Sequence, residues 1–129
     1  MFSHMVVGSN DIDRSQKFYD ALFAAMGGQP GRRDDKGRLI YFHNGALFLV
    51  TPPIDGNPAT YANGGTIGFG MTSPEQADAW HKAGVEAGGR AIENPPGIRP
   101  ASTGDLYLAY LRDPDGNKLC ALYRMPAAA

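Results

Sequence analysis

The sequence has a single cysteine, no long apolar run and almost no net charge, and each shortage excludes a class of protein. One cysteine in 129 residues cannot form an internal disulfide, which is typical of a reducing compartment. No apolar run approaches the roughly 20 residues that cross a bilayer, and the start lacks the pattern of a signal peptide. The formal net charge is −1 and no block of basic residues stands out. We therefore expect a cytoplasmic protein that binds neither nucleic acid nor membranes.

The length and composition suit one globular domain. Of the 129 residues, 43% are hydrophobic and 19% are charged, which are ordinary values for a chain with its own core. We predict a single domain over residues 1–126. The alanine-rich residues 127–129 are expected to be a frayed tail.

Two hairpins are predicted from their turn residues. Residues 106–124 read as two strands that flank Asp113-Pro114-Asp115-Gly116, in which proline presets φ and glycine takes the left-handed conformation. Residues 38–51 form a fainter copy, with Asn44-Gly45 as its turn.

Two amphipathic helices are predicted from capping residues and apolar spacing. The first begins after Ser9, Asn10 and Asp11 and ends at about residue 26, before two glycines. The second begins at Pro74, with Ser73 as its cap, and ends before Gly88 and Gly89.

The two halves of the chain repeat one another. A shift of 62 residues places residues 4–8 on residues 66–70, together with the helix caps and terminating glycines. The hairpins align after a shift of 71, because a longer loop precedes the second hairpin. Each copy reads strand, helix, strand, strand, strand. We predict repeats over about residues 1–53 and 64–125, joined by a linker at residues 54–63.

Strand alternation assigns a face to each side chain. In the first strand Met5 and Val7 should face the helix, and in its counterpart Ile67, Phe69 and Met71 should do so. The opposite faces then carry small, apolar or weakly polar residues: His4, Leu49, Thr66, Gly68 and Cys120. Two such βαβββ modules predict an α+β fold in which a curved mixed sheet surrounds a cleft and the helices lie outside.

The pattern resembles a known family. The start at residues 4–8, the helix start at 11–15 with Phe18 and Tyr19, and the ending at 113–119 are similar to the vicinal oxygen chelate superfamily. This is the fold of glyoxalase I, extradiol dioxygenases and bleomycin-resistance proteins. The resemblance covers nearly the whole chain. It implies the paired-module fold, a small-molecule ligand and a homodimer, with the modules pairing within one chain or by exchange between two.

The resemblance also implies four positions for metal ligands, and here the sequence departs from the pattern. Metal enzymes of this superfamily take ligands from the first and last strand of each copy, which correspond to His4, Leu49, Thr66 and Cys120. Only His4 is an ordinary ligand, Leu49 has no donor, and Cys120 alone does not complete a set. We therefore expect no cofactor and no metal residues, with a divalent metal as the less favoured alternative.

Several residues are candidates for contact with a ligand. His4 is a general base in one interpretation and a hydrogen-bonded cleft residue in the other. Arg99 lies in a stiff loop, where it clamps an anionic group or ties the loop to Asp105 or Glu93. Tyr110 is an aromatic platform if it faces the cleft.

Two functions remain open from the sequence. The first is a glyoxalase- and bleomycin-resistance-like protein that binds a small organic molecule at His4, Leu49, Thr66, Gly68, Arg99, Tyr110 and Cys120 without a catalytic metal. The second is an enzyme: a glyoxalase-like lyase or isomerase or a dioxygenase-type enzyme with a reduced or atypical set of metal ligands, or metal-independent acid–base chemistry at His4. The residue types at positions 49, 66 and 120 favour binding. The ligand itself does not follow from the sequence.

Overall fold

The computed structural model describes residues 1–127 and contains two helices and nine strands within that range. Its first half holds one strand, one helix and three further strands: β1 His4–Gly8, α1 Ile12–Ala25, β2 Arg32–Arg33, β3 Leu39–His43 and β4 Ala46–Thr51. These elements occur in the order that the sequence predicts. The predicted frayed tail is residues 127–129, of which 128 and 129 lie outside the described range.

The second half follows the same plan with one extra strand. Its elements are β5 Ile67–Gly70, α2 Pro74–Glu86, β6 Arg90–Ala91, β7 Gly97–Arg99, β8 Leu106–Arg112 and β9 Lys118–Arg124. The sequence predicted only a rigid loop around β7. Instead Gly97 and Arg99 pair with Leu108 and Leu106 of β8, because the stiff loop carries the chain back along the edge of the hairpin.

The strands form two mixed sheets. The first sheet has the order β1-β4-β3-β2, and the second has the order β5-β9-β8-β6 with β7 also on β8. In each sheet the first strand runs parallel to the last and the hairpin strands run antiparallel. The predicted α+β class is confirmed, and the sheets do not close into a barrel.

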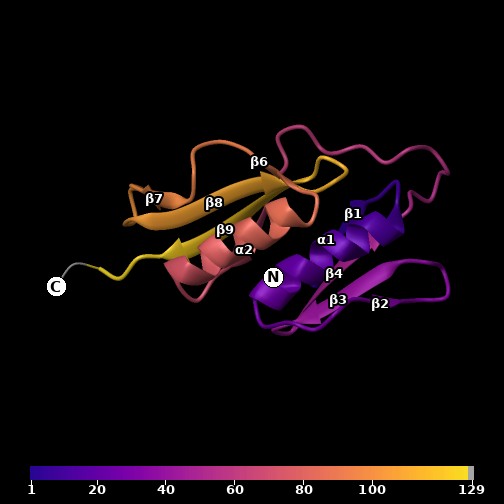
Figure 1. Ribbon diagram of the computed structural model, residues 1–129, viewed down its shortest axis with the longest axis horizontal. Coiled ribbons are helices and arrows are strands. Elements are labelled where there is room, and N and C mark those ends of the chain that lie inside the picture. Colours follow the sequence, from indigo (N-terminus) through magenta and orange to yellow (C-terminus); the bar gives the residue numbers. More distant parts are fainter. Residues whose placement is uncertain (128–129) are drawn as a thin grey trace.

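Both helices begin at the predicted caps. The Asp11 carboxylate accepts a hydrogen bond from the Arg14 N–H at 3.0 Å, and the Ser73 hydroxyl accepts one from the Gln76 N–H at 3.0 Å. In Figure 1 the two helices run side by side across the middle of the molecule, with β2–β4 on one side and β7–β9 on the other. Within residues 1–127, no helix is long and apolar enough to span a membrane.

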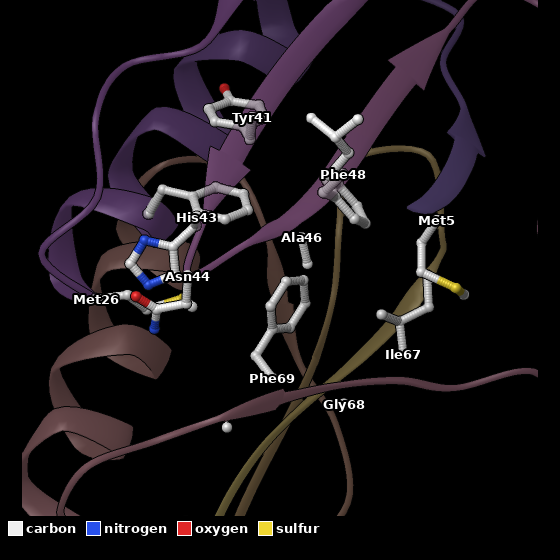
Figure 2. A pocket seen from close by; sticks show the side chains of 13 residues that line it. Met5, Met26, Tyr41, His43, Asn44, Ala46, Phe48, Ile67, Gly68 and Phe69 are labelled. Carbon is white, nitrogen blue, oxygen red and sulfur yellow. The ribbon is translucent and has the colours of Figure 1, made fainter. Parts of the chain in front are cut away.

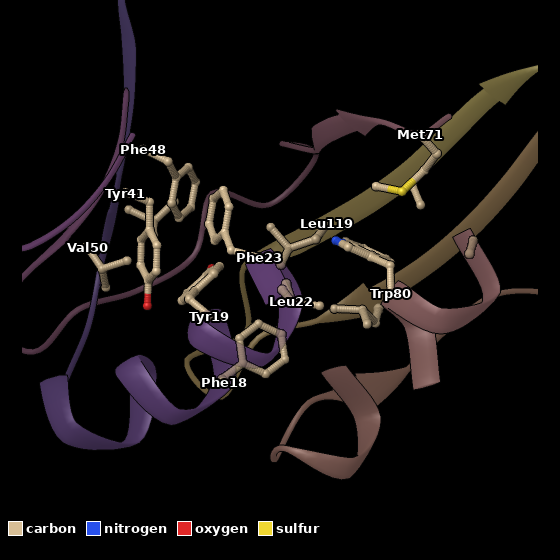
Figure 3. Packing of buried hydrophobic residues seen from close by; sticks show 14 of the residues in the cluster. Phe18, Tyr19, Leu22, Phe23, Tyr41, Phe48, Val50, Met71, Trp80 and Leu119 are labelled. Atoms are coloured by element: carbon tan, nitrogen blue, oxygen red, sulfur yellow. The ribbon is translucent and has the colours of Figure 1, made fainter. Parts of the chain in front are cut away.

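One hydrophobic core joins the two modules. Figure 3 shows Phe18, Tyr19 and Leu22 of α1 between the strands of the first sheet and Trp80 of α2. Phe23 stacks on Tyr41 with ring centroids 4.4 Å apart and meets Phe69 of the second sheet edge to face. The helix-facing side of each sheet is therefore buried. The opposite sides of the sheets, called the open faces below, carry the residues that the sequence singles out.

Candidate functional site

The open face of the first sheet is apolar and largely exposed. Strand register places His4 beside Leu47 and Val6 beside Leu49, with Ile40 and Phe42 continuing the same face on β3. The neighbouring residues in each strand point toward the helix; Val50 is fully buried and Phe48 is 6% exposed. By contrast Phe42 is 67% exposed and Val6 is 48% exposed. An apolar face of this kind indicates a surface that another molecule covers.

His4 stands on this open face with one ring nitrogen engaged. Its Nδ1 lies 2.7 Å from the hydroxyl of Ser3, and the side chain is exposed. One interpretation of the sequence makes His4 a hydrogen-bonded cleft residue, and its hydrogen-bond partner is the neighbouring Ser3. The contact with Ser3 leaves Nε2 as the ring atom available to a ligand.

The open face of the second sheet brings three of the predicted residues into one row. Gly68 of β5 pairs with Cys120 of β9, and Cys120 pairs with Tyr110 of β8. A side chain at Gly68 would meet nothing within 4 Å, and the same holds at Gly70. The row therefore has open space in front of β5 and an aromatic ring at its other end. Thr66 comes just before β5 and is exposed.

The Cys120 side chain is the buried member of this row. The side chain is 5% exposed, and its thiol donates a weak hydrogen bond to the carbonyl of Ala121 at 3.4 Å. Burial raises the pKa of the Cys120 thiol, and burial together with the neighbouring thiol raises the pKa of Tyr110. Because a nucleophile or a metal ligand must be a thiolate, this environment favours an inert cysteine.

The charged residues around Tyr110 are already paired. The Lys118 ammonium lies 5.0 Å from the centre of the Tyr110 ring and forms an ion pair with Glu93. Arg99 donates hydrogen bonds to the carbonyls of Asn94 and Pro95 at 3.1 and 2.9 Å. Arg99 thus binds its own loop through backbone carbonyls, and not through Asp105 or Glu93, which the sequence suggested.

The predicted residues therefore form two groups on two sheets. His4 and Leu49 share the first open face, and Gly68, Cys120 and Tyr110 share the second. Leu49, Thr66 and Gly68 line three different cavities. Among residues 1–127, no three His, Cys, Asp or Glu side chains are grouped so that they could hold a metal ion.

A cavity of about 290 Å³ was not anticipated from the sequence. It lies on the helix-facing side, where β1 and β4 of the first sheet approach β5 of the second (Figure 2). Phe48, Phe69 and Ile67 line its interior, and His43 and Asn44 lie at one end. In the sequence Asn44 belongs to the predicted turn of the first hairpin, and no local pattern places residues 43 and 44 beside β5.

Comparisons with known proteins were made for the sequence and for the fold. The sequence model of the Glyoxalase/Bleomycin resistance protein/Dioxygenase superfamily matches residues 1–121. None of the curated protein sequences matches the chain. A glyoxalase/bleomycin resistance protein from Albidiferax ferrireducens T118 is similar in structure, with 54% identity and a TM-score of 0.93 over 96% of this chain and 99% of that one.

More distant structures share the fold alone. A glyoxalase-related enzyme from Fulvimarina pelagi is 19% identical, with a TM-score of 0.71 over 100% of this chain and 93% of that one. A lactoylglutathione lyase from Agrobacterium tumefaciens is 18% identical, with a TM-score of 0.65 over 95% of this chain and 92% of that one. These likenesses agree with the predicted paired-module architecture.

Proposed function

The chain belongs to the Glyoxalase/Bleomycin resistance protein/Dioxygenase superfamily, and on that premise we propose that it binds a small organic molecule against the open faces of its sheets, without a catalytic metal. The observation that carries this proposal is the chemistry of the four positions from which metal enzymes of the family take their ligands. His4 is exposed and offers one nitrogen, but Leu49 has no donor atom. Thr66 offers only a neutral hydroxyl, and the pKa of the buried Cys120 thiol is raised.

The space in front of the second sheet supports a ligand of modest size. Gly68 and Gly70 leave the area before β5 empty to beyond 4 Å, and Tyr110 offers one ring face at the end of the row. Few polar groups border this space. Such a surface suits an organic molecule that is held by apolar and aromatic contacts and oriented by one or two hydrogen bonds.

We propose further that the protein is a homodimer. Val6, Phe42 and Leu47 are 48%, 67% and 38% exposed on one face of the first sheet. A second copy that covers this face would remove their apolar surface from water and would turn two open faces into the walls of one cleft. Phe42→Ser is expected to yield monomers in light-scattering chromatography, whereas Val85→Ser, which alters an exposed valine on α2, is not.

An enzymatic role of His4 is the second candidate. The contact of Nδ1 with Ser3 at 2.7 Å holds the ring on an exposed face, with Nε2 available as a general base. This would permit isomerase or lyase chemistry of the glyoxalase type without a complete set of metal ligands. Gain of turnover with candidate substrates, and its loss in His4→Gln, would favour this function over simple binding.

Anaerobic purification followed by elemental analysis and native mass spectrometry tests the main proposal. We expect a protein mass with less than stoichiometric metal and, where the ligand is retained, an organic adduct. Gly68→Leu should abolish the adduct, because the new side chain fills the space before β5. Val85→Phe adds similar bulk to the solvent side of α2 and should keep it. A stoichiometric metal that is lost in His4→Gln would overturn the proposal.

A further inference from the structure

The cavity between β4 and β5 lies mainly on the helix-facing side of the sheets, and Leu47, Gly68 and Gly70 of the open faces form part of its edge. Its walls are the helix-facing side chains Met5, Phe48, Ile67 and Phe69, which point away from the faces that carry His4 and Cys120. Figure 2 shows Phe48 and Phe69 approaching each other from the two sheets, with Ala46 between them. A molecule in this cavity would therefore contact mainly other side chains than the site that we propose above, with Gly68 and Gly70 at the edge of both.

The walls are aromatic and have defined geometry. Phe48 and Phe69 lie with ring centroids 5.6 Å apart at an interplanar angle of 63°, and Phe23 closes the inner side 5.9 Å from Phe69. Phe23 is itself held by its stack on Tyr41. Rings that are fixed in this way offer both edges and faces for contact with a bound molecule, and such contacts favour a planar aromatic ligand.

The cavity also has one polar end. His43 and Asn44 belong to the tight turn between β3 and β4, where Asn44 has a φ of 49° and Gly45 a φ of 81°. The His43 ring packs against Gly28, since a Cβ there would lie 3.0 Å from its Nδ1. An imidazole N–H and an amide NH₂ at the same end of an apolar cavity are donors for a single acceptor group, such as a carboxylate.

The rim is apolar and incompletely covered. Met5 is 37% exposed and Leu47 is 38% exposed at the mouth, and Ile67 and Phe69 are only half-buried although they adjoin the core. A ligand would complete the burial of these side chains, and the flexible methionines Met5 and Met26 would adapt to its outline.

From these observations we propose that the cavity between β4 and β5 is a second ligand site, for a small aromatic acid. Its ring packs against the exposed sides of Phe48 and Phe69, and its carboxylate accepts hydrogen bonds from His43 and Asn44. The volume of about 290 Å³ is at the lower end of the range for ligand pockets and suits one or two fused rings.

The single tryptophan provides a direct readout. Trp80 is fully buried, and its ring centroid lies 6.0 Å from that of Phe69. The protein labelled with ¹⁵N should give one indole N–H signal, and titration with 2-naphthoate should shift it to saturation. A lack of any saturable shift up to millimolar 2-naphthoate would overturn the proposal.

Variants locate the binding. Ala46→Phe fills the cavity from an exposed position and should weaken 2-naphthoate binding at least tenfold, and Ala46→Leu serves if the larger residue prevents folding. His43→Leu keeps an apolar wall and removes the imidazole donor while Asn44 remains, so we expect roughly a tenfold loss of affinity. Tyr110→Leu, which removes the aromatic ring from the open face and does not touch the cavity, should leave the shift intact. If Tyr110→Leu abolishes the shift and Ala46→Phe does not, the acid binds at the open face and the second site is refuted.

Discussion

The Tyr19 hydroxyl donates a hydrogen bond of 2.5 Å to the carboxylate of Asp113, and this bond joins the two modules through the core. Tyr19 is fully buried on α1, and Asp113 is 4% exposed at the turn between β8 and β9. The same carboxylate accepts hydrogen bonds from the Asn117 amide and from the backbone of Asp115 and Asn117. Burial raises the pKa of Asp113, and these donors oppose the rise.

Removal of this hydroxyl should destabilise the whole chain. In Tyr19→Phe the ring still fills the core, but one acceptor of a buried carboxylate is left without its donor. We expect a loss of about 1–3 kcal/mol in the free energy of unfolding, measured with urea.

Tyr107→Phe is the matched control for this change. Its hydroxyl donates to Asp78 at 2.6 Å on the surface, where water can replace the tyrosine. The expected loss is below about 0.5 kcal/mol. Equal losses in the two variants would contradict the role that we assign to Tyr19.

Alkaline pH should weaken the fold. Burial first, and then the charge of Asp113, raise the pKa of Tyr19 well above its usual value, and burial likewise raises the pKa of Tyr41. Below about pH 10 both states keep these protons, so stability does not depend on them. Above it the unfolded chain loses protons that the folded chain retains, and each tyrosine costs about 1.4 kcal/mol per pH unit.

Urea unfolding at several pH values between 9 and 11 measures this slope. The decline should be shallower in Tyr19→Phe, because one of the tyrosine hydroxyls whose pKa the folded chain raises is absent. An unchanged slope in that variant would show that other groups cause the alkaline loss.

Gly89 should not tolerate a side chain. A Cβ there would lie 2.5 Å from the Phe18 ring, 2.8 Å from the carbonyl oxygen of Gly84 and 2.9 Å from that of Arg112. Two of these neighbours are backbone and cannot move aside. We expect Gly89→Ala to cost about 1–3 kcal/mol of stability in thermal or urea unfolding.

The comparison for Gly89→Ala is Gly68→Ala, in a strand where the added methyl group meets open space. That change should be neutral or stabilising by up to about 1 kcal/mol, since alanine restricts the unfolded chain. If Gly89→Ala proves equally harmless, the result would contradict the close packing of Gly89 against Phe18 and the backbone of β8.

Cys120 should react slowly while the protein is folded. The thiol is 5% exposed and burial raises its pKa, so little thiolate is available to an alkylating agent. We expect iodoacetamide at pH 8 to modify it at least about tenfold more slowly in buffer than in concentrated urea. Rapid modification of the folded protein, followed by mass spectrometry, would instead indicate an activated cysteine.

The local structure could be predicted because its causes are local. Asp11 and Ser73 cap the helices through hydrogen bonds that span three residues, and Asn44 and Gly45 adopt the positive φ values that their turn requires. Strand alternation correctly separates Val50, which is fully buried, from its neighbour Leu49. The repeat, and with it the fold class, follows from the same patterns found twice.

Other features could not be predicted, because they depend on residues far apart in the chain. Asp113 looked like an ordinary turn residue, although its partner Tyr19 lies 94 positions away. Gly89 looked like a helix terminator, yet Gly88 has the positive φ of 109° and Gly89 is required by close packing. Nothing in the sequence indicated that His43 and Phe69 border one cavity.

The sequence by itself determined the elements, the faces of the strands and the membership of a family, because hydrogen bonds between near neighbours and the alternation of side chains act over a few residues. Only the tertiary structure decided that Cys120 is buried, that Arg99 holds its own loop and that β4 and β5 enclose a cavity. Burial and cavities arise where separate elements meet, and the distances between those elements are set by the packing of the whole core.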